Sequence, residues 1–158
     1  MADKSPRLLD GLTSTMTYEQ MRCYADTLNV TTSSALLPAG MIGFYDEATR
    51  TIFIDRQLIY CQKHCTLVHE LIHWQHADAT RDGVYGPRLE RRTRRETALK
   101  LVNPLQYQTA KAMYESDPYQ IACELDVTLQ IIQDYRILLD EQLTHAPLRL
   151  IGRQRWKR

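Results

Sequence analysis

The chain has 158 residues, a formal net charge of +1, and a composition of 44% hydrophobic and 25% charged residues. This length can bury the core of one domain without disulfides, and the composition excludes fibrous repeats and wholesale disorder. No apolar run approaches the roughly 20 residues that cross a bilayer, and the first residues lack the apolar stretch of a secretory signal. We therefore expect a cytoplasmic protein that does not enter membranes and whose cysteines stay free.

Hydrophobic spacing predicts the elements in chain order. A first helix is expected over about residues 18–28, capped by Thr17, and residues 31–40 are expected to form a loop. Two short segments rich in β-branched and aromatic residues predict an antiparallel hairpin over about 41–55, with strands near 41–46 and 51–55. Further helices are expected near 58–79, 88–102, 105–115, 118–125 and 128–140.

This order predicts an α+β fold, a mostly helical domain with a small antiparallel sheet and a helical C-terminal part. We expect one domain over residues 1–143, followed by a basic, flexible tail over residues 144–158. Residues 105–140 have the rhythm of a helix-turn-helix, with a short turn at Asp126. The second helix of that pair offers a single cation, Arg136, so packing is the favoured interpretation and docking of a repressor is the alternative.

Residues 69–76 read HELIHWQH and contain the pattern His-Glu-any-any-His. Residues four apart share a helix face, so His69 and His73 can direct their imidazoles at one ion. Their stripe borders the apolar stripe of the helix, which places the site at the edge of the core, as an open catalytic metal site requires. We predict a site for one zinc ion (Zn2+), with Glu70 as the catalytic base. The alternative is an ordinary helix whose histidines face solvent or fill the core.

Two other sets of donors on this helix are less suitable. Cys61, Cys65, His69 and His73 also step by four, but the first and last lie about 18 Å apart along a helix, too far to close on one ion. Both cysteines are therefore interpreted as core thiols. His76 would have to reach back along the helix axis, so we expect it to support the site or face the substrate.

A hydrolytic zinc site commonly takes a third protein ligand from another helix. Glu90 and Glu96 lie in the Arg-rich helix, 17 and 23 residues after His73. Glu96 shares its stripe with residues suited to the core, Leu89, Thr93 and Leu99. Glu90 lies at the helix start, where acidic residues also complement the dipole. Glu96 is therefore the predicted third ligand and Glu90 the alternative, while a salt bridge to Arg92 is the structural explanation for Glu96.

The succession GFYDEATRTIFID, CTLVHELIHWQH and RRETALKLVNP resembles the ImmA/IrrE metallopeptidases (the DUF955 group) of bacteria, phages and integrative elements. The resemblance spans about residues 15–140. It implies a zincin-like fold and a third zinc ligand from an E-x-A-like helix, which maps onto Glu96. It also implies a cytoplasmic zinc endopeptidase that cleaves a regulatory protein, typically a helix-turn-helix repressor of a phage or mobile element.

The expected partner is thus a protein substrate, held extended by strand addition to the hairpin. Tyr85 and His76 are candidates for stabilising the oxyanion. The Arg-rich helix and the basic tail can neutralise phosphates, so nucleic acid contact is a secondary alternative, although a charge run is more often a solvated face. Two other functions stay open: a metal-bearing adaptor that binds a repressor without cutting it, and a DNA-binding regulator whose metal site is structural.

Overall fold

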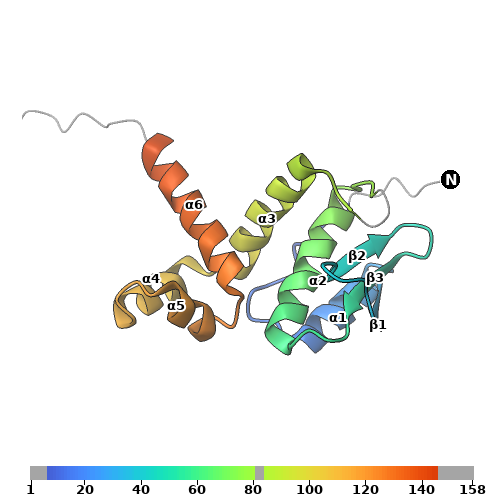
Figure 1. Ribbon diagram of the computed structural model, residues 1–158, viewed down its shortest axis with the longest axis horizontal. Coiled ribbons are helices and arrows are strands. Elements are labelled where there is room, and N and C mark those ends of the chain that lie inside the picture. Colours follow the sequence, from blue (N-terminus) through green and yellow to red (C-terminus); the bar gives the residue numbers. More distant parts are fainter. Residues whose placement is uncertain (1–6, 81–83, 146–158) are drawn as a thin grey trace, which may run out of the picture.

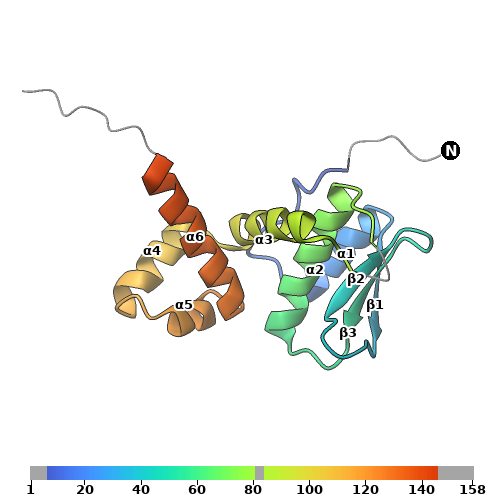
Figure 2. The ribbon, with the colours of Figure 1, turned by 45° about the horizontal axis from the view of Figure 1, so that its top comes forward.

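The structure, a computed structural model, describes residues 7–80 and 84–145 of the chain. Within these ranges the elements follow in this order: α1 (Tyr18–Thr27), β1 (Thr31–Ala35), β2 (Gly43–Asp46), β3 (Thr51–Asp55), α2 (Tyr60–Gln75), α3 (Pro87–Leu101), α4 (Pro104–Met113), α5 (Pro118–Glu124) and α6 (Leu129–His145). Figures 1 and 2 show the sheet, α1 and α2 at one end of the molecule and α4, α5 and α6 at the other, with α3 leading between them. The predicted α+β class is confirmed.

The predicted helices are all present, and the turn between α5 and α6 lies at Asp126 as expected, with φ of 51°. The largest differences in bounds are at α2, which ends at Gln75, and at α6, which continues to His145. The predicted tail therefore begins inside α6, and residues 146–158 lie outside the described residues. No helix in the described ranges is long and apolar enough to span a membrane.

The sheet has three strands in the order β1-β3-β2, with β1 parallel to β3 and β2 antiparallel to it. The predicted hairpin is therefore β2 and β3, and Asp46 stabilises its turn by accepting hydrogen bonds from Ala48 N and Thr49 Oγ1. The expectation of an antiparallel sheet is wrong for β1, which lies where the sequence predicts a loop. Only Thr32 of this polar edge strand is buried, so the apolar alternation that indicates a strand is missing.

Helix α2 runs through the centre of the N-terminal part and packs against α1, β2, β3 and α3. Four of its aliphatic side chains are buried: Leu67, Val68, Leu71 and Ile72. Burial of each contributes about 1.5–3 kcal/mol to folding, so the helix that carries HELIH is held firmly in place. From the sheet, Tyr45, Ile52 and Ile54 complete this core.

Helix α3 crosses α2 on the side away from α1 and also packs against α6. Small side chains, Thr93, Thr97 and Ala98, form much of its buried face and allow the two helices to approach closely. On the other side, Arg94 makes a double contact with Asp134 of α6, at 2.6 and 3.1 Å. The second helix of the helix-turn-helix-like part is thus packed against α3, which agrees with the packing interpretation.

Candidate metal centre and active site

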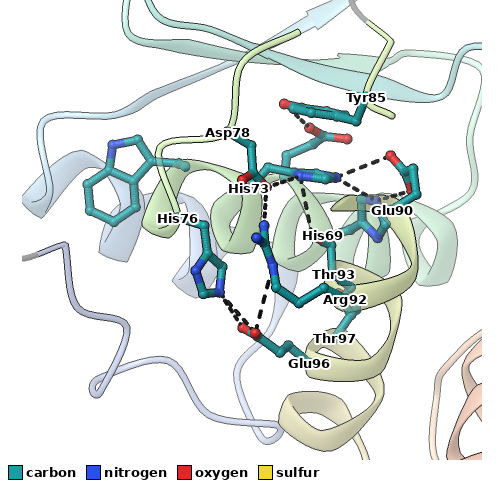
Figure 3. Close-up of polar contacts among 12 residues, drawn as sticks. His69, His73, His76, Asp78, Tyr85, Glu90, Arg92, Thr93, Glu96 and Thr97 are labelled. Atoms are coloured by element: carbon teal, nitrogen blue, oxygen red, sulfur yellow. Dashed lines mark hydrogen bonds and ion pairs between the residues drawn. The ribbon is translucent and has the colours of Figure 1, made fainter. Parts of the chain in front are cut away.

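Two histidines of α2 and one glutamate of α3 converge on a single point (Figure 3). His69 Nε2 and His73 Nε2 lie 3.2 Å apart. One carboxylate faces both rings, with Glu90 Oε2 at 3.1 Å from His69 Nε2 and Glu90 Oε1 at 3.2 Å from His73 Nε2. Among the described residues, His69, His73 and Glu90 form the one cluster of three metal-binding side chains close enough together to hold an ion.

The spacing of these atoms fits a zinc ion. Ligand atoms at the corners of a tetrahedron, each about 2.0–2.1 Å from zinc, lie about 3.3 Å from one another. The two ring nitrogens lie 3.2 Å apart, and each lies 3.1 or 3.2 Å from a different oxygen of the Glu90 carboxylate, all close to this value. The Nε2 atom of each histidine faces both a carboxylate oxygen of Glu90 and the Nε2 atom of the other histidine. A cation bound among these acceptor atoms would stabilise their close approach. The residues present therefore fit the group that the motif implies.

The structure brings Glu90, the alternative third ligand, to the histidines and places Glu96 elsewhere. Glu90 lies in line with Thr93 and Thr97, three and then four residues further along the face of α3 that contacts α2. Glu96 lies off this face. Leu89, Thr93 and Leu99 are the residues that pointed to Glu96 in the sequence; Thr93 is buried, but Leu99 is 54% exposed. The buried residues of α3 are Thr93, Thr97, Ala98 and Leu101, and the two threonines are the part of this face that lies in line with Glu90.

Glu96 instead binds His76, the third histidine of HELIHWQH. Its Oε1 and Oε2 lie 2.9 and 2.8 Å from His76 Nε2. Arg92 lies beside them, with its Nε 4.0 Å from Glu96 Oε1, so the salt bridge weighed as the structural explanation for Glu96 is present. A cation at this pair would meet the positive charge of Arg92, and so this outer pair is a poor metal site.

The electrostatics of Glu90 favour its ionised form. Burial would raise its pKa, but hydrogen bonds with His69 and His73 outweigh burial and lower the pKa to about 2. Glu90 therefore carries a full negative charge at neutral pH and is ready to bind a divalent cation. The side chain of His73 is fully buried, whereas those of His69 and Glu90 are 21% and 36% exposed, so the set is closed on one side and open on the other.

Glu70, the predicted base, is buried next to this set. Burial raises its pKa to about 7, and the nearby His69 and the Tyr85 hydroxyl only partly oppose this effect. Tyr85 Oη donates a hydrogen bond to Glu70 Oε2 at 3.2 Å. The Tyr85 hydroxyl therefore orients the carboxylate, and in this arrangement it is not free to stabilise an oxyanion. The Tyr85 ring also stacks on the His73 ring, with centroids 3.4 Å apart and planes within 3°.

A cavity of about 650 Å³ opens onto the site. Its floor includes His69, Glu70 and Glu90. One wall is the largely apolar segment that leads into β2, residues 38–43, with Val84 and Tyr85 nearby, and the other wall is formed by Arg94, Thr128 and Gln130. The helical C-terminal part therefore helps to enclose the site.

Gly43, at the start of β2, allows the strand to lie directly on α2. A Cβ atom built there would lie 2.6 Å from Thr66 Cγ2, 3.1 Å from the Phe53 carbonyl oxygen and 3.5 Å from Glu70 Cγ. Any side chain at this position would push β2 away from the helix that carries the site. Gly43 was not among the residues predicted for the site, although an isolated glycine within a strand is itself a signal of close backbone approach.

Comparisons with models of protein families, with curated proteins and with solved structures found no match. What this site can do therefore follows from its residues alone. Two imidazoles and a carboxylate can hold a divalent cation. Beside them, a second carboxylate can exchange a proton near neutral pH, and an open cavity can admit a substrate.

Proposed function

We propose that this protein is a zinc-dependent endopeptidase of the ImmA/IrrE type that cleaves a regulatory protein. The observation that carries the proposal is the convergence of His69, His73 and Glu90 beside the buried carboxylate of Glu70, at the floor of an open cavity. Two histidines and a glutamate are a donor set of hydrolytic zinc enzymes, whose open position admits water or substrate. In this proposal Glu90 replaces Glu96 as the third ligand.

Bound zinc would supply Lewis-acid activation of water and of the scissile carbonyl. Glu70 takes the proton of the attacking water and passes it to the leaving nitrogen. Its pKa of about 7 suits both halves of that transfer, since the group can accept and release a proton near neutral pH. Tyr85 keeps the Glu70 carboxylate in place through its hydroxyl. The burial of Glu70 keeps bulk water from competing for the transferred proton.

The substrate is held extended along β2. Strand β3 is central in the sheet and already paired on both sides, whereas β2 has one neighbour and offers its outer edge. Of the two strands considered from the sequence, only β2 can therefore accept an added strand. Met41 and Ile42, which lead into β2, and Gly43, its first residue, line the cavity, which places an added chain beside Glu70 and the proposed metal ligands. The apolar lining favours a hydrophobic substrate side chain at this point.

The resemblance to ImmA/IrrE peptidases suggests the class of substrate, a helix-turn-helix repressor of a phage or mobile element. It also suggests a cytoplasmic location, with which the free state of Cys23, Cys61, Cys65 and Cys123 is compatible. Direct binding of DNA is less well supported, because three arginines of the helix-turn-helix-like part and of α3 are engaged in contacts within the protein. Arg94 and Arg95 pair with Asp134 and Glu141, while Arg136 donates to Tyr107 and Ser116.

The test uses the full chain with zinc and a proteome-derived peptide library as the probe. The unmodified protein is compared with Glu70→Gln, which keeps the shape of the side chain and removes the base. We expect cleavage by the unmodified protein that needs zinc and is lost in Glu70→Gln, by roughly a hundredfold or more. Both proteins should bind one zinc ion per chain. Equal cleavage by the two proteins would refute the role of Glu70.

A second arm separates cleavage from docking. Each protein is produced together with candidate helix-turn-helix repressors, and both repression and the length of the repressor are followed. The proposal expects repressor fragments and relief of repression with the unmodified protein only. If Glu70→Gln relieves repression equally well and no fragments form, the protein is a metal-bearing adaptor and the peptidase proposal is wrong.

A further inference from the structure

The innermost ligand, His73, is held from behind by residues that the proposed mechanism does not use. Its Nδ1 lies 2.7 Å from Asp78 Oδ2, and the same oxygen accepts a hydrogen bond from Arg92 Nη2 (Figure 3). The Asp78 side chain is only 5% exposed. Burial would raise the pKa of Asp78, but the hydrogen bonds from Arg92 and His73 outweigh it and lower the pKa. Paired with the Arg92 guanidinium, the Asp78 carboxylate can only accept, so the ring nitrogen that lies 2.7 Å from it carries a proton.

The end of α2 delivers Asp78 to this position. Ala77 adopts the left-handed conformation, with φ of 52°, directly after the helix cap. The Asp78 amide then donates to the His73 carbonyl at 3.1 Å and the Ala77 amide donates to the Trp74 carbonyl at 3.0 Å, the pattern of a Schellman motif. Asp78 thus contacts His73 twice, through its backbone and through its side chain, and the turn fixes both contacts together.

We infer that Asp78 is a positioning residue that fixes His73 as its Nδ1–H tautomer, with the Nε2 lone pair directed at the metal position before metal binds. The inference rests on the metal centre of the proposed function and adds to it the residue that prepares a ligand. A histidine that binds a metal through one nitrogen gains basicity and a fixed orientation when its other nitrogen donates to a carboxylate.

Asp78 decides the tautomer because the other neighbour of Nδ1 does not. Thr93 Oγ1 lies 3.2 Å from the same nitrogen. A hydroxyl can donate or accept, so Thr93 alone would permit either tautomer. In the tautomer protonated at Nε2, the proton would occupy the side that faces Glu90 and block the lone pair that a metal needs. Glu90 Oε1, a charged acceptor 3.2 Å from Nε2, favours this form, but Asp78 Oδ2 lies nearer to its ring nitrogen, at 2.7 Å, and the Asp78 side chain is more deeply buried. Asp78 therefore holds the ring proton at Nδ1.

His76 and Glu96, the outer pair, are linked to Asp78 indirectly, through Arg92. Arg92 bridges Asp78 and Glu96, with its Nε 4.0 Å from Glu96 Oε1 as an ion pair. Glu96 is in turn bound by His76. The contact between Arg92 and Glu96 is a long ion pair without a hydrogen bond, so Glu96 acts on His73 only weakly, through Arg92 and Asp78. The effect on His73 should therefore fall in the order Asp78, Arg92, Glu96.

The first measurement is the tautomer of His73 in the metal-free protein, read from the ring-nitrogen signals in ¹⁵N NMR. The unmodified protein should show His73 as the Nδ1–H form. Asp78→Ala should give a mixture of the two tautomers, and Asp78→Asn, which keeps a neutral acceptor, should lie between them. An unmodified protein with His73 mainly in the Nε2–H form would overturn the inference without the need for any variant.

The second measurement is zinc affinity, by competition with a chelator, on the same proteins. We expect a loss of about ten- to hundredfold in Asp78→Ala and a smaller loss in Asp78→Asn. Glu141→Gln is the matched control, since it breaks another contact between a carboxylate and an arginine of α3, Arg95, away from His73. An affinity of Asp78→Ala within roughly twofold of the unmodified protein would also overturn the inference.

Failure of the metal centre itself has a different signature. If His73→Ala keeps its zinc, the proposed function is wrong, whereas the tautomer measurement still stands. If zinc binds as proposed but no peptide is cleaved, the endopeptidase proposal fails and the role of Asp78 in zinc affinity remains.

Discussion

Histidines and glutamates join α2 to α3 at two places: an inner one, where His69 and His73 contact Glu90, and an outer one, where His76 at the helix cap contacts Glu96. The inner one is longer, 3.2 Å from His73 Nε2 to Glu90 Oε1, and the outer one is shorter, 2.8 Å from His76 Nε2 to Glu96 Oε2. At the inner contact, a second imidazole, that of His69, also faces the carboxylate, and the His73 side chain is completely buried. The outer contact has one imidazole, an arginine alongside and a histidine side chain that is 33% exposed.

The difference shows that a short distance does not identify a metal site. A histidine and a carboxylate at hydrogen-bond distance form an ordinary exposed ion pair, which contributes little to stability. What distinguishes the inner contact is the number of acceptors directed at one point. Substitutions on the two sides of the helix pair should therefore differ sharply.

The largest expected effect is that of the two glutamates on zinc binding. Glu90→Gln removes one of three ligands and should weaken zinc binding by about a thousandfold, whereas Glu96→Gln should weaken it by no more than about fivefold. Competition with a chelator measures both, and His76→Ala should behave like Glu96→Gln. A larger loss in Glu96→Gln than in Glu90→Gln would reverse the comparison and restore Glu96 as the ligand.

The next largest effect is expected at Gly43, where β2 lies directly against α2 beside the inner contact. Gly43→Ala places a methyl group against Thr66, so the strand must move away from α2. We expect peptide cleavage to fall by about ten- to a hundredfold, since small displacements at an active site have large kinetic effects. Gly86→Ala is the matched control, because a Cβ there meets nothing within 4 Å. Equal activity of both variants would show that β2 does not guide the substrate.

Loss of the hydroxyl that holds Glu70 should have a moderate effect. Tyr85→Phe removes the 3.2 Å hydrogen bond to Glu70 and should lower kcat/KM by about tenfold while zinc binding stays unchanged. Tyr114→Phe removes a comparable bond, 2.8 Å long, to Glu124 on the surface and should not change activity. Equal activities of the two variants would remove Tyr85 from the catalytic machinery.

The smallest effect concerns the turn that separates the inner and outer histidines. Ala77 has φ of 52°, a conformation that is strained for alanine and natural for glycine. Ala77→Gly should stabilise the protein by about 1 kcal/mol and raise Tm by about 2–4 °C, with zinc affinity unchanged. Thermal unfolding of the metal-free protein measures this. A lower Tm would show that the turn is not strained in solution.

Much of the fold can be predicted from the sequence, because it depends on periodicity within single elements. The spacing of α2 and the capping box of Thr17 and Gln20 are local signals, and both are present in the structure. Strand β1 could not be predicted in this way, since its polar side chains gain their place only from pairing with β3.

In the candidate site too, residues within one helix could be predicted from the sequence, whereas residues brought in by packing could not. His69, Glu70 and His73 share one helix, so their relation is set by helical geometry. The partner glutamate depends on which face of α3 packs against α2, and the part of that face in line with Glu90 consists of Thr93 and Thr97, which a pattern of hydrophobic residues does not reveal. Asp78 depends on a left-handed residue after the helix, and alanine gives no hint of such a turn, whereas a glycine would have done so.

The position of Glu90 has a consequence for the unfolded chain. His73 and Glu90 are 17 residues apart in the sequence, so an ion bound to both would close a covalent-like ring through the chain. Such a clip acts as a disulfide does: it removes conformations from the unfolded ensemble, an effect of about 3 kcal/mol for a ring of this size. Zinc would then stabilise the packing of α2 against α3 as well as take part in catalysis, and removal of zinc by a chelator should loosen the two helices together.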